Sequence, residues 1–219
     1  MPDTPAIPES TGPATPEDHQ PSQEQASHTL NFRQHWLDTP SDDFTDGQVM
    51  LHSDQMGLTL NITLEDKDIH NEATRPNQRT WELGDVVEIF VAVPGSARYW
   101  ELHITPGNQR LQLAWDPAGF KAYRQGDRPF SDFFVEDMGF MQSQTQIDSA
   151  NNRWHIQAFI PWSSLGLPDG QSEYALEIAV CRYDATHNKD KATLSSTAPL
   201  TKASYHRRHE WDTLRLATE

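Results

Sequence analysis

The sequence predicts an all-β protein, an antiparallel β-sandwich with a jelly-roll-like or immunoglobulin-like arrangement of two layers. Three observations lead to this fold class. Apolar and polar side chains alternate with a period of two in most segments after residue 28. Turn sequences such as "PGS", "TPGN", "LPDG" and "THNKD" separate these segments at short intervals. A helical period of 3.6 is nearly absent, apart from one turn expected at "PWSSLG".

The first 28 residues differ in composition from the rest of the chain. They are rich in Pro, Ser, Thr, Glu and Gln and contain almost no large apolar side chains. Such a segment cannot bury enough apolar surface to offset the entropy lost on ordering. We therefore expect a disordered N-terminal leader over residues 1–28 and one sandwich domain over residues 29–219.

Each expected strand places apolar side chains on one face and polar side chains on the other. Residues 57–66 show this clearly, since four apolar side chains share one face: Leu58, Leu60, Ile62 and Leu64. The same alternation occurs in segments 99–105, 110–115, 153–160 and 174–184. These segments supply enough strands for two packed sheets.

Residues 79–93, "RTWELGDVVEIFVAV", form an exception to the alternation. The run is almost continuously apolar, which is typical of a strand buried on both faces, yet it contains Glu88 and follows Trp81. A buried carboxyl group is costly unless it has partners, so Glu88 indicates a specific site or a buried ion pair.

The polar faces of the strands carry carboxylates, amides and imidazoles. If the strands are neighbours, one sheet surface presents Asn61, Glu88, Glu101, His103, His155, Gln157 and Glu177. Such a surface is either ordinary solvated sheet or a site for a hydroxyl-rich ligand, because donors and acceptors converge on it.

Composition narrows the classes of partner. The chain has 219 residues and a formal net charge of -15, from 32 acidic and 17 basic residues, so we expect no nucleic acid partner. No apolar run reaches the roughly 18 to 20 residues of a membrane span, and the first residues lack the pattern of a signal peptide. Cys181 is the only cysteine, so the sequence supports neither a disulfide framework nor a thiolate metal cluster.

Five motifs in order carry a resemblance to a known family. They are "WELGDVVEIFV" (81–91), "YWELHITPG" (99–107), "RWHIQAFIPWSSLG" (153–166), "LSST" (194–197) and "SYHRRHEWDTLRL" (204–216). In this order they resemble the family 9 carbohydrate-binding modules and the DOMON-like domains related to them, over residues 29–216. The resemblance implies a jelly-roll-like sandwich, no catalytic activity, and binding of sugars, often at chain ends. It also implies polysaccharide-degrading enzymes as partners and a periplasmic or secreted location.

The resemblance implies a sugar clamp, in which two aromatic rings hold a sugar ring between them. Matching the motifs places this clamp on four side chains of the chain. Trp81 and Tyr205 match the two aromatic walls, Glu88 matches the carboxylate between them, and His103 stands where well-known members have an arginine. Thr197 and Asp212 are further departures from the family pattern. We also count Glu101 and Arg182 as candidate binding residues. Glu101 shares a face with His103, and Arg182 is an alternative ion-pair partner for a buried Glu88.

The expected chemistry follows from the shape of a sugar ring. Aromatic rings cover its C–H faces, while a carboxylate and a donor hold the hydroxyls at its rim. Covering about 100 Å² of apolar surface is worth only about 2 to 3 kcal/mol before ordering costs, so we expect affinities weaker than micromolar.

Three further interpretations remain open. The acidic segment 63–74 offers Glu65, Asp66 and Asp68 as ligands for a structural calcium ion, although its spacing is not that of an EF-hand. DOMON-like sandwiches also include haem binders, for which Met138, Met141 and His103 are candidate axial ligands. The departures at His103, Thr197 and Asp212 also suit an interaction or spacer domain that has lost its ligand. Carboxylates alone, without a nucleophile motif or a phosphate loop, do not indicate an enzyme.

Overall fold

A computed structural model describes residues 28–218 of the chain. Over this range it contains eleven strands, one α-helix and four short 3-10 helices. The strands are β1 (His28–Asn31), β2 (Gly47–Ser53), β3 (Gly57–Glu65), β4 (Val86–Ala92), β5 (Tyr99–Ile104), β6 (Arg110–Trp115), β7 (Gln142–Asp148), β8 (Arg153–Pro161), β9 (Glu173–Asp184), β10 (Thr193–Ser196) and β11 (Asp212–Ala217). The helices are α1 (Pro117–Gln125) and the 3-10 helices η1 (Thr80–Glu82), η2 (Phe130–Phe133), η3 (Trp162–Leu165) and η4 (Arg208–Glu210). The disorder expected for the leader concerns residues that lie outside this range, except His28, which begins β1.

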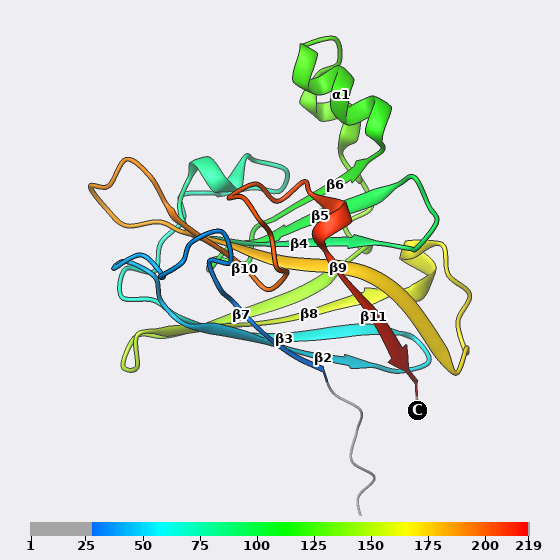
Figure 1. The fold of residues 1–219 in the computed structure, drawn as a ribbon, viewed down its shortest axis with the longest axis horizontal. Helices are drawn as coiled ribbons and strands as arrows, with labels where there is room; N and C mark the ends of the chain where they lie inside the picture. The colour runs from blue at the N-terminus through cyan, green and yellow to red at the C-terminus, as the bar shows by residue number, and fades with distance from the viewer. Residues whose placement is uncertain (1–27, 219) are drawn as a thin grey trace, which may run out of the picture.

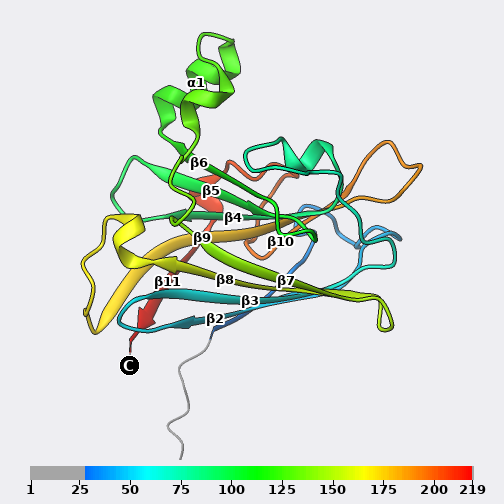
Figure 2. The same cartoon turned by 180° about the vertical axis from the view of Figure 1, so that it is seen from behind.

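The strands form two antiparallel sheets packed as a sandwich. The first sheet has the order β1-β2-β3-β8-β7, and the second has the order β10-β9-β4-β5-β6. The long strand β9 pairs with β10 through its last residues and with β11 through its first ones. Figures 1 and 2 show the two layers, with α1 projecting beyond β6 on the side away from the first sheet. The prediction of an all-β antiparallel sandwich is confirmed.

The main core lies between the sheets and uses the predicted alternation. Leu58, Leu60, Ile62 and Leu64 of β3 are buried, and Val87, Ile89 and Val91 of β4 meet them from the second sheet. The turn expected at "PWSSLG" is η3, where the Trp162 ring stacks on Tyr174 with centroids 3.9 Å apart.

The outer face of the second sheet carries a second apolar cluster, which we call the outer cluster. All seven residues of β4 are buried, as its continuous apolar run predicts. Segments from other parts of the chain cover this face, with aromatic side chains from α1, from η2 and from the stretch before β11. The members of the outer cluster include Phe90, Tyr99, Trp115, Phe133, Tyr205 and Trp211, with Trp81, Phe120, Tyr123, Phe130 and Tyr183 partly buried against them.

Helix α1 was not expected from the sequence, although its ends carry local signals. Asp116 caps the N-terminus by accepting hydrogen bonds from the backbone N–H groups of Ala118 and Gly119, and Pro117 occupies the first turn. Gly126 ends the helix with a φ of 81°, in the left-handed region that favours glycine. In the described part of the chain, no helix is long and apolar enough to span a bilayer.

The single polar surface expected from the sequence is divided between the two sheets. Asn61 pairs with Gln157 in the first sheet, whereas Glu88 pairs with His103 in the second. Their side chains point away from the shared core, so the two polar groups lie on opposite sides of the sandwich. The condition for one shared surface, that all these strands are neighbours, is not met, because alternation along a strand does not tell which sheet the strand joins.

Candidate functional site

A buried polar cluster lies on the outer face of the second sheet. Glu88 of β4 is directly opposite His103 of β5, and Glu101 is two residues from His103 on the same face. The His103 Nε2 atom lies 2.8 Å from a Glu101 oxygen and 3.4 Å from a Glu88 oxygen. The structure therefore brings together three of the residues predicted for the site.

Glu101 is held by several donors. The Trp115 indole Nε1–H donates to Glu101 at 2.6 Å, and the second Glu101 oxygen accepts from His103. On its other side, the His103 ring has Nδ1 2.7 Å from the Thr80 hydroxyl. The His206 ring, with Nε2 3.6 Å from Glu101, closes the cluster from the stretch before β11. Glu101 is thus fixed as an ionised anchor for His103.

Glu88 has far fewer partners. Only 3% of its surface is exposed, and within the described residues its carboxyl group makes no hydrogen bond beyond the 3.4 Å approach to His103. Most buried carboxyl groups are hydrogen-bonded to other protein groups. Glu88 is not, so its carboxyl group can still donate a hydrogen bond to a ligand or accept one from it.

The protonation states follow from burial and proximity. Burial raises the pKa of Glu88 to about 8, and the neighbouring Glu101 adds to this effect. Burial alone would raise the pKa of Glu101, but the hydrogen bonds from His103 and Trp115 and the nearby His206 and His103 rings together lower it below its usual value. Burial would lower the pKa of His103, yet Glu88 and Glu101 raise it overall. At neutral pH we therefore assign a protonated Glu88 beside an ionised Glu101 that is hydrogen-bonded to His103.

This assignment predicts a pH-dependent stability. Because the folded pKa of Glu88 lies above the unfolded value of 4.5, the folded state holds an extra proton between those two pH values, and stability falls as pH rises through this window. Glu88→Gln removes the titration. We expect the stability of the variant to fall by about 3 kcal/mol less than that of the wild type between about pH 5.5 and about pH 8.5 in urea unfolding. Asp85, whose pKa burial also raises, to about 7, is common to both proteins and cancels in the comparison. Parallel pH profiles would contradict the assigned proton.

Trp81 lies on η1 at the edge of the polar cluster. Its ring is half-buried and meets His103 at 5.5 Å and Phe130 at 5.8 Å between centroids, both edge to face. The segment before it holds η1 in place, since the Asn71 amide donates to the carbonyls of Thr80 and Asp85. Trp81 therefore places an aromatic ring beside His103, the residue opposite Glu88.

Tyr205 does not present a free ring face in this structure. It is 5% exposed, its hydroxyl donates to the Arg182 carbonyl at 2.6 Å, and its ring packs edge to face against Phe90 and Tyr183. A stacking wall needs an accessible face, so the role expected for Tyr205 does not match its position. The residue acts here as a packing side chain of the outer cluster.

Tyr183, which sequence reasoning missed, occupies a more accessible position. It is half-buried on β9, opposite Val86 of β4, and so lies on the outer face. Tyr183 is two residues from Cys181, the β9 partner of Glu88, so its phenol lies on the same face of the sheet as the carboxyl group. Trp81 contacts His103 of β5 and Tyr183 lies on β9, and these are the two strands on either side of β4. The alternation in "CRYD" contained the signal, because Tyr183 shares a face with Cys181.

Arg182 does not belong to the site, and the prediction that it contacts ligand or pairs with Glu88 is wrong. It lies opposite Val87, on the inner face, and is 1% exposed. Its Nη2 atom is 3.1 Å from Asp66 and 3.2 Å from Asp184. Neighbouring residues of a strand point to opposite faces, so Arg182 cannot share a face with Glu88, whose partner on β9 is Cys181.

The three residues expected to bind calcium do not converge. Glu65 pairs with Arg153 at 2.6 Å on the surface, and Asp66 pairs with the buried Arg182. Asp68 turns instead toward His187, 2.7 Å away. Each carboxylate has its own cationic or imidazole partner, so these residues do not fit a shared hard cation.

The haem ligands suggested by the sequence also lie apart. Met141 is buried in the core between the sheets, whereas His103 is on the outer face of the second sheet. The Met138 sulfur contacts the Gln112 amide at 3.7 Å. Met141 and His103 therefore lie on opposite sides of the second sheet, where they do not suit the two axial positions of one haem.

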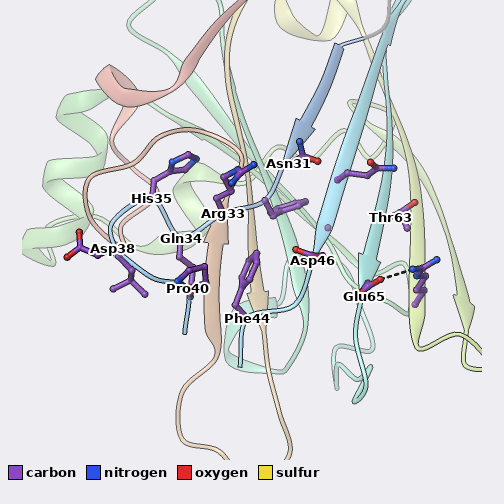
Figure 3. A pocket seen from close by; sticks show the side chains of 15 residues that line it. Asn31, Arg33, Gln34, His35, Asp38, Pro40, Phe44, Asp46, Thr63 and Glu65 are labelled. Carbon is purple, nitrogen blue, oxygen red and sulfur yellow. Dashed lines mark hydrogen bonds and ion pairs between the residues drawn. The ribbon is translucent and has the colours of Figure 1, made fainter. Parts of the chain in front are cut away.

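A large open cleft of about 850 Å³ lies away from the polar cluster, between the β1–β2 connection and the ends of β3 and β8 (Figure 3). Its walls are mostly exposed polar side chains, and one side carries the Glu65–Arg153 ion pair. Phe44 supplies one half-buried ring. We place the candidate site at the polar cluster, because a buried carboxyl group with unused hydrogen-bonding capacity occurs there beside an accessible indole.

The two-layer arrangement defines the class of fold: it is that of the family 9 carbohydrate-binding modules. Among solved structures, a Bacteroides uniformis protein assigned to carbohydrate binding is similar with a TM-score of 0.63 and 13% identity, over 89% of this chain and 87% of that one. A family 9 module from Caldicellulosiruptor kristjanssonii in complex with cellotriose is similar with a TM-score of 0.54 and 11% identity, over 83% of this chain and 79% of that one. Its glucose complex gives 0.52 and 11%, over 83% and 80%. No protein-family model and no curated protein sequence matches the chain.

Proposed function

We propose that this chain is a non-catalytic carbohydrate-binding domain whose site is the polar cluster at Glu88. The observation that carries the proposal is Glu88 itself, a buried carboxyl group without a hydrogen bond among the described residues, flanked by the half-buried rings of Trp81 and Tyr183. The fold shared with modules solved in complex with cellotriose and glucose supports it.

The side chains suit the two kinds of surface on a sugar. The indole of Trp81 offers an apolar face to the C–H groups of a pyranose, and Tyr183 takes the opposite wall in place of Tyr205. Glu88, protonated near neutral pH, can donate to one hydroxyl and accept from another, with the His103 ring beside it. Together they form a clamp around the ring.

The cluster is closed in this structure, so sugar entry requires a movement. Trp81 and Phe130 cover it from η1 and η2, which are short segments outside the sheets. Loop-borne side chains move more easily than strands, and these two rings are the parts we expect to shift on binding.

The bonding of Glu101 argues against glycoside hydrolysis. A hydrolase needs two carboxyl groups facing the scissile bond, one as acid and one as base or nucleophile. Both oxygens of Glu101 are occupied, by Trp115 and His103, which leaves Glu88 as the one carboxyl group of the cluster with capacity for a ligand. We infer that the domain binds sugar on behalf of polysaccharide-degrading enzymes.

A titration tests the proposal. Glucose and cellotriose are added to the full chain while tryptophan fluorescence and heat are followed, and a glycan array extends the search to other sugars. We expect saturable binding with Kd weaker than about micromolar, because one ring buries little apolar surface. No response to any sugar in all three measurements would refute carbohydrate binding and favour a spacer domain.

A further inference from the structure

A second cluster of chemically active side chains lies on two loops at one end of the sandwich. Asp68 and His70 follow β3, and His187 follows β9. Residues 66–72 and 185–189 thus meet although more than a hundred positions separate them. None of these side chains takes part in the polar cluster at Glu88.

The two imidazole rings stack on each other beside the carboxylate. Their centroids are 3.9 Å apart and their planes are inclined by 30°. The Nδ1 atom of His187 lies 2.7 Å from a side-chain oxygen of Asp68, and Nδ1 of His70 lies 2.8 Å from the Asp68 carbonyl oxygen. One ligand atom from each side chain lies within 4.8 Å of the other two. A metal at about 2.0 to 2.2 Å from each ligand needs these atoms roughly 3 to 4 Å apart, so small side-chain movements would bring them together around an ion.

A buried carboxylate holds both loops in register. Asp85, at the start of the segment that becomes β4, accepts the backbone N–H of His70 at 2.7 Å and that of Ala185 at 2.7 Å. The Asp68 carboxylate additionally accepts the backbone N–H of His187 at 2.6 Å. The three ligand side chains are therefore positioned by hydrogen bonds that exist without a metal, which is the support that metal ligands require.

We propose that Asp68, His70 and His187 form a binding site for a divalent transition-metal ion of the zinc type. Two imidazole nitrogens and one carboxylate oxygen match the ligands of zinc sites that keep a position open to water, whereas calcium prefers oxygen ligands alone. Acidic side chains surround the site, since Asp66, Asp85 and Asp184 lie together beneath the loops with Arg182 as their cationic partner. This surplus of negative charge favours a cation.

The site has a mechanical consequence for the fold. The segment after His70 is bonded to η1, because the backbone N–H of Glu72 donates to the Leu83 carbonyl and the Asn71 amide donates to the Thr80 carbonyl. A bound ion would fix the β9–β10 loop to the segment that positions Trp81. The metal site itself stands independently of sugar binding.

Calorimetric titration of the full, untagged, chelator-treated chain with Zn²⁺ tests the proposal, with Co²⁺ absorption as a probe of coordination. We expect one ion per chain and a tetrahedral Co²⁺ spectrum. His187→Gln and His70→Gln should each weaken binding at least about tenfold. Zn²⁺ at about 100 times the wild-type Kd should raise the Tm of the wild type by roughly 5 to 10 °C and that of His187→Gln by no more than about half as much.

The control variants distinguish Zn²⁺ binding at this site from Zn²⁺ binding by other histidines. His209 is exposed, and its one ion pair within residues 28–218 is with Glu210, so His209→Gln should bind Zn²⁺ like the wild type. His187 is also exposed, so its variant should fold, which circular dichroism verifies. Absence of Zn²⁺ binding, or equal affinity in the wild type and both site variants, would overturn the proposal. Sugar binding is measured separately, and its failure would leave this result intact.

Discussion

Trp81→Ala is expected to lower sugar affinity by about 30- to 100-fold, the equivalent of about 2 to 3 kcal/mol. The indole is the accessible aromatic ring next to Glu88 and His103, and its loss removes one whole wall of the proposed clamp. Aromatic side chains at the centre of a site carry a large share of the binding energy, so no other single truncation in the site should cost as much. Calorimetric titration with the best sugar from the array measures the effect.

Two variants make the test specific. Trp81→Phe keeps an apolar ring and should retain part of the affinity. Phe44→Ala removes a half-buried ring from the open cleft on another part of the surface (Figure 3) and should leave sugar binding unchanged. If Phe44→Ala abolished binding and Trp81→Ala did not, the site would lie in the cleft.

The strands could be predicted from sequence because their signal is local. The apolar side chains of β3 alternate with polar ones, and all four predicted inward residues are buried. The continuous run in β4 likewise predicted burial on both faces, which the outer cluster provides. Strand order is not local, and for that reason residues such as Asn61 and Glu88 could not be assigned to different sheets beforehand.

The site was predictable to the extent that it depends on neighbouring strands. Glu88, Glu101 and His103 do converge, because the two strands that carry them pair directly. The partners that complete the cluster come from three other segments: Thr80 from η1, Trp115 from β6, and His206 from the stretch before β11. Nothing in the spacing of the chain shows which of these side chains reaches the sheet. The position of Tyr205 depended on the course of a long loop, which motif order alone does not determine.

Arg182→Ala is expected to destabilise the fold by about 3 to 5 kcal/mol. Arg182 is buried and is the cationic partner of Asp66 and Asp184, whose carboxylates are also almost fully buried. Its removal leaves two buried charges without compensation, and Thr45 loses the donor at 2.8 Å that orients its hydroxyl. Urea unfolding of the variant measures the loss. Sugar affinity of the folded variant should stay close to that of the wild type, because Arg182 faces away from the site.

Matched variants separate charge from packing. Arg182→Met combined with Asp66→Asn and Asp184→Asn removes the charges together and should recover much of the stability, because no buried ion then lacks a partner. Arg153→Ala breaks the exposed pair with Glu65, in which the side chains are 46% and 48% accessible, and should cost less than about 1 kcal/mol. A loss in Arg182→Ala as small as in Arg153→Ala would mean that water reaches the aspartates. The ion pairs of Arg182 with Asp66 and Asp184 would then contribute little to the stability of the fold.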